Sequence, residues 1–329
     1  MIITPYTHKE FPALSDAVFL AGPCPREDYE DDWRNEAIDI LNKIGFTGDI
    51  INPTNPEYDN DLKKQTLWEY KGLHLASHIL FWIPRDKNHP AFTTNIEFGE
   101  WMNQPNVVVG FPPESERNEY IKERLAMISK TVSTSLQDAC FQVLENNNRF
   151  AKTFFTSDTH FSAQRTLDLS YRPFLTVEEM DLKLISNWNK RVSMNDEVVH
   201  LGDFGNPEIV KWLNFKKMYF LSGNYEKKDP SIVKKLLEDD RVVLIDDKSK
   251  KVKVCNKEYW ICHEPLNDMG EDKFYLYGHI HRLQMVKRNG INVGIDANRF
   301  MPMSTQEIDF LRGGIDNHFD ENVFSDKCF

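Results

Sequence analysis

The chain has 329 residues, of which 40% are hydrophobic, and this is enough apolar material for two domains with separate cores. Its formal net charge of −11 disfavours a long nucleic-acid backbone as a partner, although metal ions or local Arg side chains can still attract a small anionic substrate. No apolar run approaches the ~18 residues of a membrane span, and Met1–Lys9 has no signal-peptide pattern. The five Cys residues are scattered and form no Cys-x-x-Cys pair, which indicates a reducing cytoplasm.

Strand-like and helix-like stretches alternate through the first half of the chain. We expect strands at residues 16–21, 48–51, 78–83 and 106–110, and helices at residues 31–44 and 65–76, with a third helix beginning near Asn95. This alternation predicts a doubly wound parallel α/β sheet of the flavodoxin or Rossmann type.

Glu97 follows one of these strands and is expected in the first turn of a helix, where Thr93, Thr94 or Asn95 could provide the cap. The positive end of the helix would keep the carboxylate ionised, so it could attack a sugar C1 and carry a glycosyl intermediate. Spacing alone favours a simpler interpretation, in which Glu97 only complements the helix dipole.

The first half also resembles the nucleoside 2-deoxyribosyltransferase-like family. Six blocks in order carry the resemblance, namely Val18–Pro23, Trp33–Arg34, Asn52–Pro53, Trp68–Glu69, Ile79–Arg85 and Thr93–Gly99. The resemblance implies that Glu97 is the nucleophile, and that the substrate contacts include Ala21, Gly22, Pro23 and Asn95. Classical members carry an Asp near the end of the middle helix; residues 73–78 have none, and Glu69 is the candidate substitute. It also implies a homo-oligomer formed through this domain.

A polar stretch, Glu145–Arg149, marks the expected domain boundary. It follows residues 118–144, where apolar side chains recur at helical spacing, and a strand is expected to open at Lys152. We therefore expect one domain at residues 1–147 and another at residues 148–329.

Five short apolar runs of the second half each end in Asp, Asn or His. The runs are residues 152–157, 197–201, 218–222, 259–262 and 273–277, and they suggest one sheet whose strand ends converge. The side chains that follow them are Asp158, His160, Asp203, Asn224, His263, His279 and His281. Each alone is more often turn chemistry or a packed histidine, but the set is too large for one tetrahedral zinc and suits two divalent metals with a shared carboxylate. Imidazole-rich ligation favours Mn²⁺, with Fe, Zn or Ni as alternatives.

Residues 152–311 resemble the calcineurin-like metallophosphoesterases, whose pattern is D-x-H, G-D, G-N-H-[DE], H and G-H-x-H. The resemblance implies an α/β sandwich in which Asp158, His160 and His281 bind one metal and Asp203 bridges both. Asn224, His263 and His279 would hold the second metal, with Asp203 and Asn224 also counted as catalytic. Tyr225 stands where the family has the His that protonates the leaving group, which favours diesters or good leaving groups. Arg172 is a candidate contact for a substrate phosphate, or it could hold the loop through a carboxylate.

The sequence therefore predicts a bifunctional enzyme acting on a small nucleoside or nucleotide, with N-glycosidic cleavage or transfer in the first domain and phosphoester hydrolysis in the second. Two alternatives stay open. The first domain could only bind a nucleotide, or the substrate could be a dinucleotide such as NAD or ADP-ribose.

Overall fold

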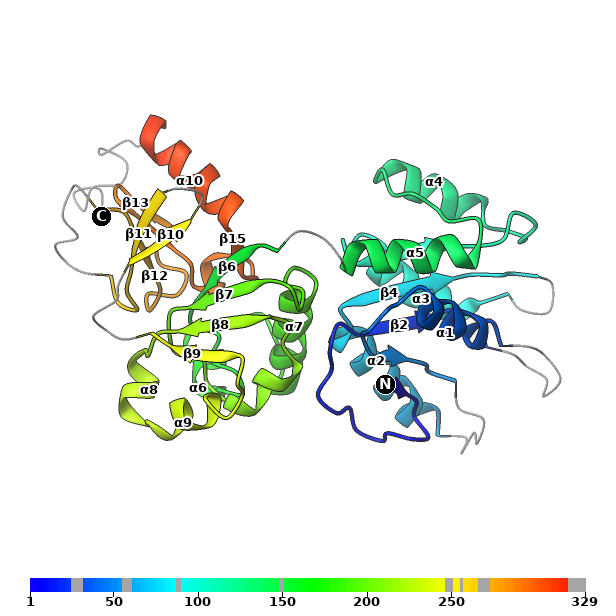
Figure 1. The fold of residues 1–329 in the computed structure, drawn as a ribbon, viewed down its shortest axis with the longest axis horizontal. Coiled ribbons are helices and arrows are strands. Elements are labelled where there is room, and N and C mark those ends of the chain that lie inside the picture. Colours follow the sequence, from blue (N-terminus) through cyan, green and yellow to red (C-terminus); the bar gives the residue numbers. More distant parts are fainter. Residues whose placement is uncertain are drawn as a thin grey trace. The chain divides into compact units, whose positions relative to one another are not determined.

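The computed structural model divides the chain into two compact units, Met1–Arg149 and Phe150–Phe329 (Figure 1). It describes residues 1–24, 32–54, 61–86, 90–147, 151–245, 251–254, 257–265 and 273–318. The boundary expected after residue 147 adjoins residues 148–150, which lie outside this part. Each unit combines helices with β-sheet, so the predicted α/β fold class is confirmed.

The first unit is built on a five-stranded sheet in the order β1-β3-β2-β4-β5, in which every pairing is parallel. Its strands are β1 (Ile2–Ile3), β2 (Val18–Ala21), β3 (Ile50–Ile51), β4 (His78–Trp82) and β5 (Val107–Gly110). Its helices are α1 (Trp33–Lys43), α2 (Leu62–Leu75), α3 (Phe92–Trp101), α4 (Glu119–Met127) and α5 (Leu136–Asn147).

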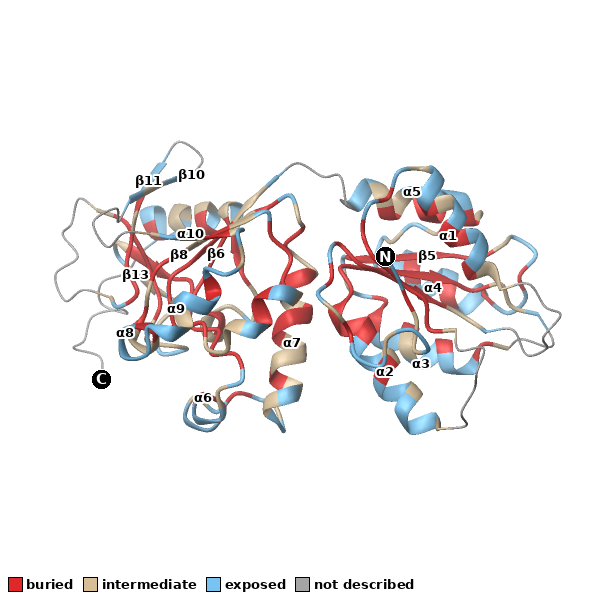
Figure 2. Ribbon diagram, turned by 60° about the horizontal axis from the view of Figure 1, so that its bottom comes forward, coloured by how far each residue is buried: buried red, intermediate tan, exposed pale blue. Residues whose placement is uncertain are grey.

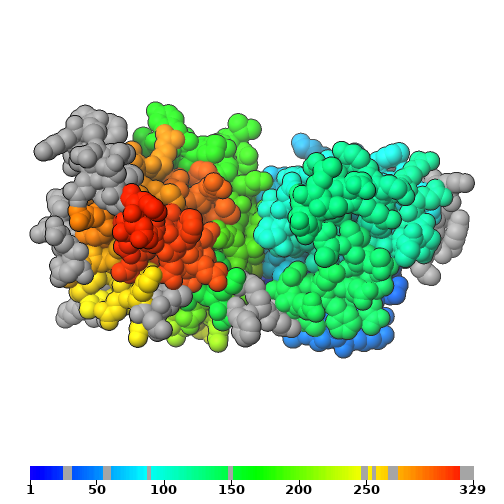
Figure 3. Space-filling view, turned by 90° about the horizontal axis from the view of Figure 1, so that it is seen from above, coloured from blue at the N-terminus to red at the C-terminus, as the bar shows by residue number. Residues whose placement is uncertain are grey.

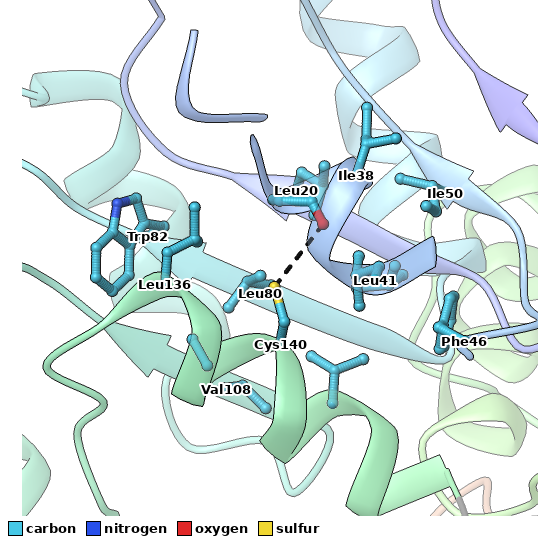
Figure 4. Close-up of a cluster of buried hydrophobic side chains, with 14 residues drawn as sticks. Leu20, Ile38, Leu41, Phe46, Ile50, Leu80, Trp82, Val108, Leu136 and Cys140 are labelled. Carbon is cyan, nitrogen blue, oxygen red and sulfur yellow. Dashed lines mark hydrogen bonds between the residues drawn. The ribbon is translucent and has the colours of Figure 1, made fainter. Parts of the chain in front are cut away.

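Helices cover both faces of this sheet, and the central strands are buried between them (Figure 2). On one face, Leu20 and Leu80 pack with Leu41 of α1 and Cys140 of α5 (Figure 4). Successive strand residues point to opposite faces, so Phe19 lies on the other side, against Gly72 of α2. The predicted doubly wound arrangement follows from this two-sided burial.

The helix expected near Asn95 is present and begins at Phe92, after Ala91 adopts a left-handed backbone with φ of 54°. Another helical prediction in this unit was wrong. The helical stretch expected over residues 118–144 is two helices, α4 and α5, because the chain turns at Ser129 with φ of 53°. Lys130 then donates from Nζ to the carbonyls of Met102 and Gln104, at 3.1 and 2.6 Å, which ties this turn to the end of α3.

The second unit contains two five-stranded sheets rather than the single sheet expected from the five apolar runs. One has the order β15-β6-β7-β8-β9, formed by Met303–Ser304, Thr153–Thr156, Glu197–His200, Lys217–Phe220 and Val242–Leu244. The other has the order β10-β11-β12-β14-β13, formed by Lys251–Val254, Lys257–Ile261, Tyr275–Tyr277, Gly290–Asn292 and Val286–Lys287. Apolar side chains of both sheets meet in one core, where Phe155 and Val199 of the first pack with Leu276 and Ile291 of the second.

The helices of this unit are α6 (Gln164–Leu169), α7 (Val177–Asn189), α8 (Asn224–Lys228), α9 (Ser231–Leu236) and α10 (Thr305–His318), with short 3-10 turns at Pro207–Trp212 and Ile295–Ala297. Figure 3 shows α10 on the surface of its unit. Ile308 and Ile315 of this helix pack in the core shared by the two sheets. Among the described residues, every helix is too short or too polar to span a bilayer.

Candidate functional site

The loops that follow the strands of the second unit bring six side chains into two groups. Asp158, His160 and His281 form one group, with their candidate ligand atoms all within 4.8 Å of one another. Asp203, His263 and His279 form the other group on the same criterion. The first group comes from the ends of β6 and β12, and the second from the ends of β7, β11 and β12.

One carboxylate oxygen of Asp203 faces both groups. Its Oδ2 lies 3.6 Å from Nε2 of His160 and 3.4 Å from Nε2 of His263. Asn224 stands beside the second group, with its Nδ2 3.1 Å from Nδ1 of His279. The seven side chains singled out from the strand ends therefore lie around a single centre.

The backbone at this centre is held in an unusual conformation. Five of the loop residues have left-handed φ values that non-glycine residues seldom adopt, namely Asp158 (59°), His160 (48°), Asp203 (58°), His279 (69°) and His281 (50°). Hydrogen bonds between loops hold this geometry, among them Asp158 N to the Gly202 carbonyl at 3.0 Å and His279 N to Asp158 Oδ2 at 2.8 Å. Strain of this kind persists only where the surrounding structure enforces it, and it concentrates at functional sites.

Glycines beside the ligands allow the loops to approach closely. A Cβ at Gly223 would lie 2.3 Å from Oδ1 of Asp203, and one at Gly278 would lie 2.4 Å from Oδ2 of Asp158. Neither separation is compatible with a side chain. The Gly-Asp, Gly-Asn and Gly-His pairs in the sequence thus reflect the packing of the loops against one another.

Several polar atoms at this centre are buried and make no hydrogen bond within the described residues. They include Oδ1 of Asp158 and both ring nitrogens of His160. Burial lowers the pKa of His160 to about 3, so its imidazole is neutral and its nitrogen lone pair is available. Buried acceptors without partners are unfavourable unless a cation binds them, so the residues present fit divalent metal ions.

Asp296 supports the first group, although no motif in the sequence pointed to it. Its Oδ2 accepts from Nδ1 of His281 at 2.7 Å, which orients that ring and leaves Nε2 for a metal. The Nδ1 of His263 is likewise 2.8 Å from the Leu201 carbonyl. Asp296 lies in the 3-10 turn Ile295–Ala297, and the fold brings it against the His281 ring.

The guanidinium of Arg172 is engaged in hydrogen bonds within the protein. Its guanidinium donates to both oxygens of Asp296 at 2.9 Å, and to the carbonyls of Thr159 and Asp158 at 2.8 and 2.7 Å. The expectation of a phosphate contact is therefore corrected, because these bonds engage the donors that a phosphate would need. Of the two expected roles, the structure has Arg172 holding the first metal loop through a carboxylate.

Glu226 is a second supporting residue that sequence reasoning did not assign. Its side chain is 2% exposed and accepts hydrogen bonds from the backbone N–H groups of Asp203, Phe204 and Gly223, at 2.9, 2.9 and 2.8 Å. It therefore ties the loop after β7 to the loop after β8. Its position as the last residue of Gly223–Glu226 was the available signal.

The first unit has a cavity of about 420 Å³ at the ends of its strands. Five residues expected to contact substrate or react with it line this cavity, namely Ala21, Gly22, Pro23, Glu69 and Glu97. A Cβ at Gly22 would lie 2.2 Å from the Trp82 carbonyl oxygen, so the loop after β2 needs glycine there. Asn95, the other expected contact, is exposed and does not line the cavity, and its side-chain oxygen accepts from Arg85.

Glu97 differs from the expectation in both place and charge. It lies in the second turn of α3, whose first turn contains no acidic residue and whose N-cap, Ala91, makes no side-chain hydrogen bond. The helix terminus therefore does not keep it ionised. Burial raises the pKa of Glu97 to about 7, the charge of Glu69 adds to the rise, and Arg34 opposes it.

Arg34 shapes this cavity, although its sequence block indicated no role for it. The side chain is fully buried, and its guanidinium donates to the carbonyls of Leu20, Gly22 and Pro23 at 3.0, 2.6 and 3.1 Å. These bonds fix the loop after β2, while the positive charge lies beside the two carboxylates of the cavity.

The protein thus belongs to the α/β class. Its first unit has a cavity lined by two carboxylates, and its second unit has a centre of the metallohydrolase type. Residues 15–115 match the family described as nucleoside 2-deoxyribosyltransferase like, and residues 152–295 match the calcineurin-like phosphoesterase superfamily domain. The chain therefore carries one domain of each family, and both resemblances are confirmed. The second match supports a metal-dependent hydrolase that uses divalent ions.

Two proteins of unassigned function are also similar to this chain. An uncharacterized protein of Methanocaldococcus jannaschii is 26% identical over 170 residues, which cover 46% of this chain and 86% of that protein. The crystal structure of a protein of unknown function from Aquifex aeolicus matches at 22% identity with a TM-score of 0.38, covering 49% of this chain and 100% of that chain.

Proposed function

We propose that the protein hydrolyses phosphodiesters in its second unit and cleaves or transfers an N-glycosidic bond of a nucleoside or nucleotide in its first. The position of Asp203 Oδ2, 3.6 Å from His160 and 3.4 Å from His263, supports the phosphoesterase most directly. A carboxylate placed in this way suits two metal ions that share a ligand. When bound, the ions would activate a water and neutralise the charge of the phosphoryl oxygens.

The ligands favour Mn²⁺ or a similar transition ion, because imidazole-rich ligation suits these ions better than Mg²⁺. The test is hydrolysis of bis-p-nitrophenyl phosphate by chelator-treated protein, before and after reloading with single metals. We expect activity to return with Mn²⁺ and to exceed that with Mg²⁺. Full turnover by the metal-free protein would contradict the proposal.

A diester preference follows from Tyr225, which follows the candidate ligand Asn224 directly. Phenol is a weak acid at neutral pH, with a reference pKa of about 10, so it protonates an alkoxide leaving group poorly. A diester with a good leaving group needs little protonation. We therefore expect bis-p-nitrophenyl phosphate to be hydrolysed faster than a simple sugar phosphate at equal concentration.

The cavity of the first unit supports chemistry at an N-glycosidic bond. Glu97 and Glu69 both line it, and burial raises the pKa of each. A carboxyl group with a pKa of about 7 is half ionised at neutral pH, so Glu97 can act as a nucleophile without strong alkali. The neighbouring acid, Glu69, also lines the cavity and is available to hydrogen-bond the sugar or the base.

A second candidate is a first unit that binds a nucleotide without reacting. The end of the middle helix favours this candidate, because classical members carry an Asp there and this chain has none. His74 stands after Leu73 instead; it is fully buried, with its Nδ1 2.8 Å from the Tyr70 carbonyl, so it packs inside the unit. If both units act on one molecule, a dinucleotide such as NAD or ADP-ribose offers an N-glycosidic bond and a pyrophosphate.

Mass spectrometry distinguishes these candidates. Protein quenched after exposure to a 2-fluoro-arabinosyl nucleoside should carry a covalent glycosyl adduct on Glu97, and Glu97→Gln should carry none. Release of free base from nucleosides, nucleotides and dinucleotides is measured in parallel. No adduct and no base released from any of them would leave the first unit a binding module.

A further inference from the structure

Arg165 lies at the rim of the metal centre, close in sequence to the ligand His160. It belongs to α6, which begins at Gln164 directly after the first metal loop. Asp181 of α7 anchors the start of this segment by accepting from the backbone N–H and the hydroxyl of Ser162, at 2.8 and 2.7 Å. The position of Arg165 is therefore tied to that of the ligand loop.

Tyr225 approaches the same rim from the loop after β8. Its backbone N–H donates to Oδ1 of Asp203 at 2.9 Å, and its ring centroid is 4.7 Å from that of His160. Its hydroxyl accepts a hydrogen bond from Nη1 of Arg165 at 3.0 Å. Two candidate ligands thus fix Tyr225, and Tyr225 in turn fixes one end of the Arg165 guanidinium.

The two arginines near the centre differ in how many of their N–H donors are already used within the protein. Arg172 is buried and bound to Asp296 and two carbonyls. Arg165 is exposed and donates through Nη1 to the uncharged Tyr225 hydroxyl, and within the described part of the chain it has no carboxylate partner. Its remaining N–H groups are therefore available to a ligand.

We propose that Arg165 binds an oxygen of the substrate's phosphoryl group at the metal centre, with Tyr225 as its positioning residue; this inference rests on the proposed phosphoesterase function. A guanidinium is planar, always charged and matches two phosphate oxygens at once. Since the Tyr225 hydroxyl accepts from Arg165, its own O–H can donate a second hydrogen bond to the same group. A local cation also offsets the formal charge of −11 for an anionic substrate.

The first test compares steady-state hydrolysis of bis-p-nitrophenyl phosphate by Mn²⁺-loaded variants. Arg165→Ala should lower kcat/KM about 10- to 100-fold, as for loss of a charge-assisted hydrogen bond. Arg165→Lys should recover part of this loss, since it keeps the charge but not the fork. Gln164→Ala, next to it on α6, is the matched control and should behave as the unaltered protein.

A double-mutant cycle tests the part of Tyr225. Tyr225→Phe should lower kcat/KM several-fold in the unaltered protein and have little further effect in the Arg165→Ala background. Equal and independent losses in both backgrounds would contradict the positioning role. Metal content and circular dichroism of each variant show whether the centre and the fold are intact.

Binding of inorganic phosphate to the Mn²⁺-loaded protein, followed by calorimetry, does not depend on turnover. Arg165→Ala should weaken this binding about tenfold while leaving Mn²⁺ affinity unchanged. Unchanged phosphate binding and unchanged kcat/KM in Arg165→Ala would overturn the inference while leaving the phosphoesterase in place. A protein that binds phosphate through Arg165 but hydrolyses no ester would refute the proposed function alone.

Discussion

The two candidate sites shift the pKa of a carboxyl group in opposite directions. Burial acts to raise the pKa of Asp203, but the hydrogen bond and charge of His263 outweigh it and bring that pKa down to about 2. Burial likewise raises the pKa of Glu97, the charge of Glu69 adds to the rise and Arg34 only partly opposes it, so this pKa is about 7. The same functional group is thus held as a permanent anion in one unit and able to change charge near neutral pH in the other. Burial acts in the same direction at both sites, and the neighbouring His263 accounts for the opposite net shift of Asp203.

The largest effect on either site should come from neutralising the carboxylate of Asp203, which faces both metal groups. Asp203→Asn keeps the size of the side chain but removes the charge that both metal groups face. Phosphodiester hydrolysis should fall by about a thousandfold or more, because the variant loses a charged ligand common to both ions. Hydrolysis of bis-p-nitrophenyl phosphate at saturating Mn²⁺ measures this. Glycosidic activity of the first unit serves as the control and should not change.

The pH dependence of the first unit tests the other half of the comparison. Attack requires the ionised form of Glu97, whose pKa is about 7, so kcat/KM for base release should rise about tenfold per pH unit below 7 and level off above it. Glu97→Gln should lower base release about 10²- to 10⁴-fold across the range. A rate already constant at pH 5 would show that Glu97 is not the group that titrates.

A smaller effect should come from the support of the first metal group. Asp296→Asn removes the carboxylate that orients His281 and should weaken Mn²⁺ binding about 10- to 100-fold. Competition with a chelating dye gives the affinity. Asp309→Asn is the matched control. Asp309 lies on α10, accepts a hydrogen bond from the Tyr259 hydroxyl at 2.8 Å and belongs to neither metal group. Equal affinities in the two variants would refute the orienting role of Asp296.

The smallest change expected is one of preference. Tyr225→His places an imidazole, a better proton donor at neutral pH, where the phenol stands. The ratio of monoester to diester hydrolysis should rise about tenfold. Rates for p-nitrophenyl phosphate and its bis ester, measured on the same preparation, give this ratio. A ratio that stays constant would mean that leaving-group protonation does not limit the reaction.

Sequence reasoning succeeded where a residue's place follows directly from the strand before it. Asp158 and Asp203 stand at strand ends, and strands of one sheet deliver such residues to one edge. Glu97 shows the limit, because its helix begins after the left-handed Ala91 and its protonation depends on Glu69 from another helix. Asp296 was missed because its contact with Arg172 joins segments distant in sequence, and its contact with His281 depends on the turn at Ile295–Ala297.

Glu226 has a consequence for how the metal centre fills. One carboxylate accepts from the loop carrying Asp203 and from Gly223, the residue before Asn224, so Glu226 couples the positions of the two loops. If two ions bind as proposed, the first should therefore help to position the loop that holds the second and raise the apparent affinity for it. Protein with a single ion should be scarce at every metal concentration, and occupancy should climb more steeply than a hyperbola.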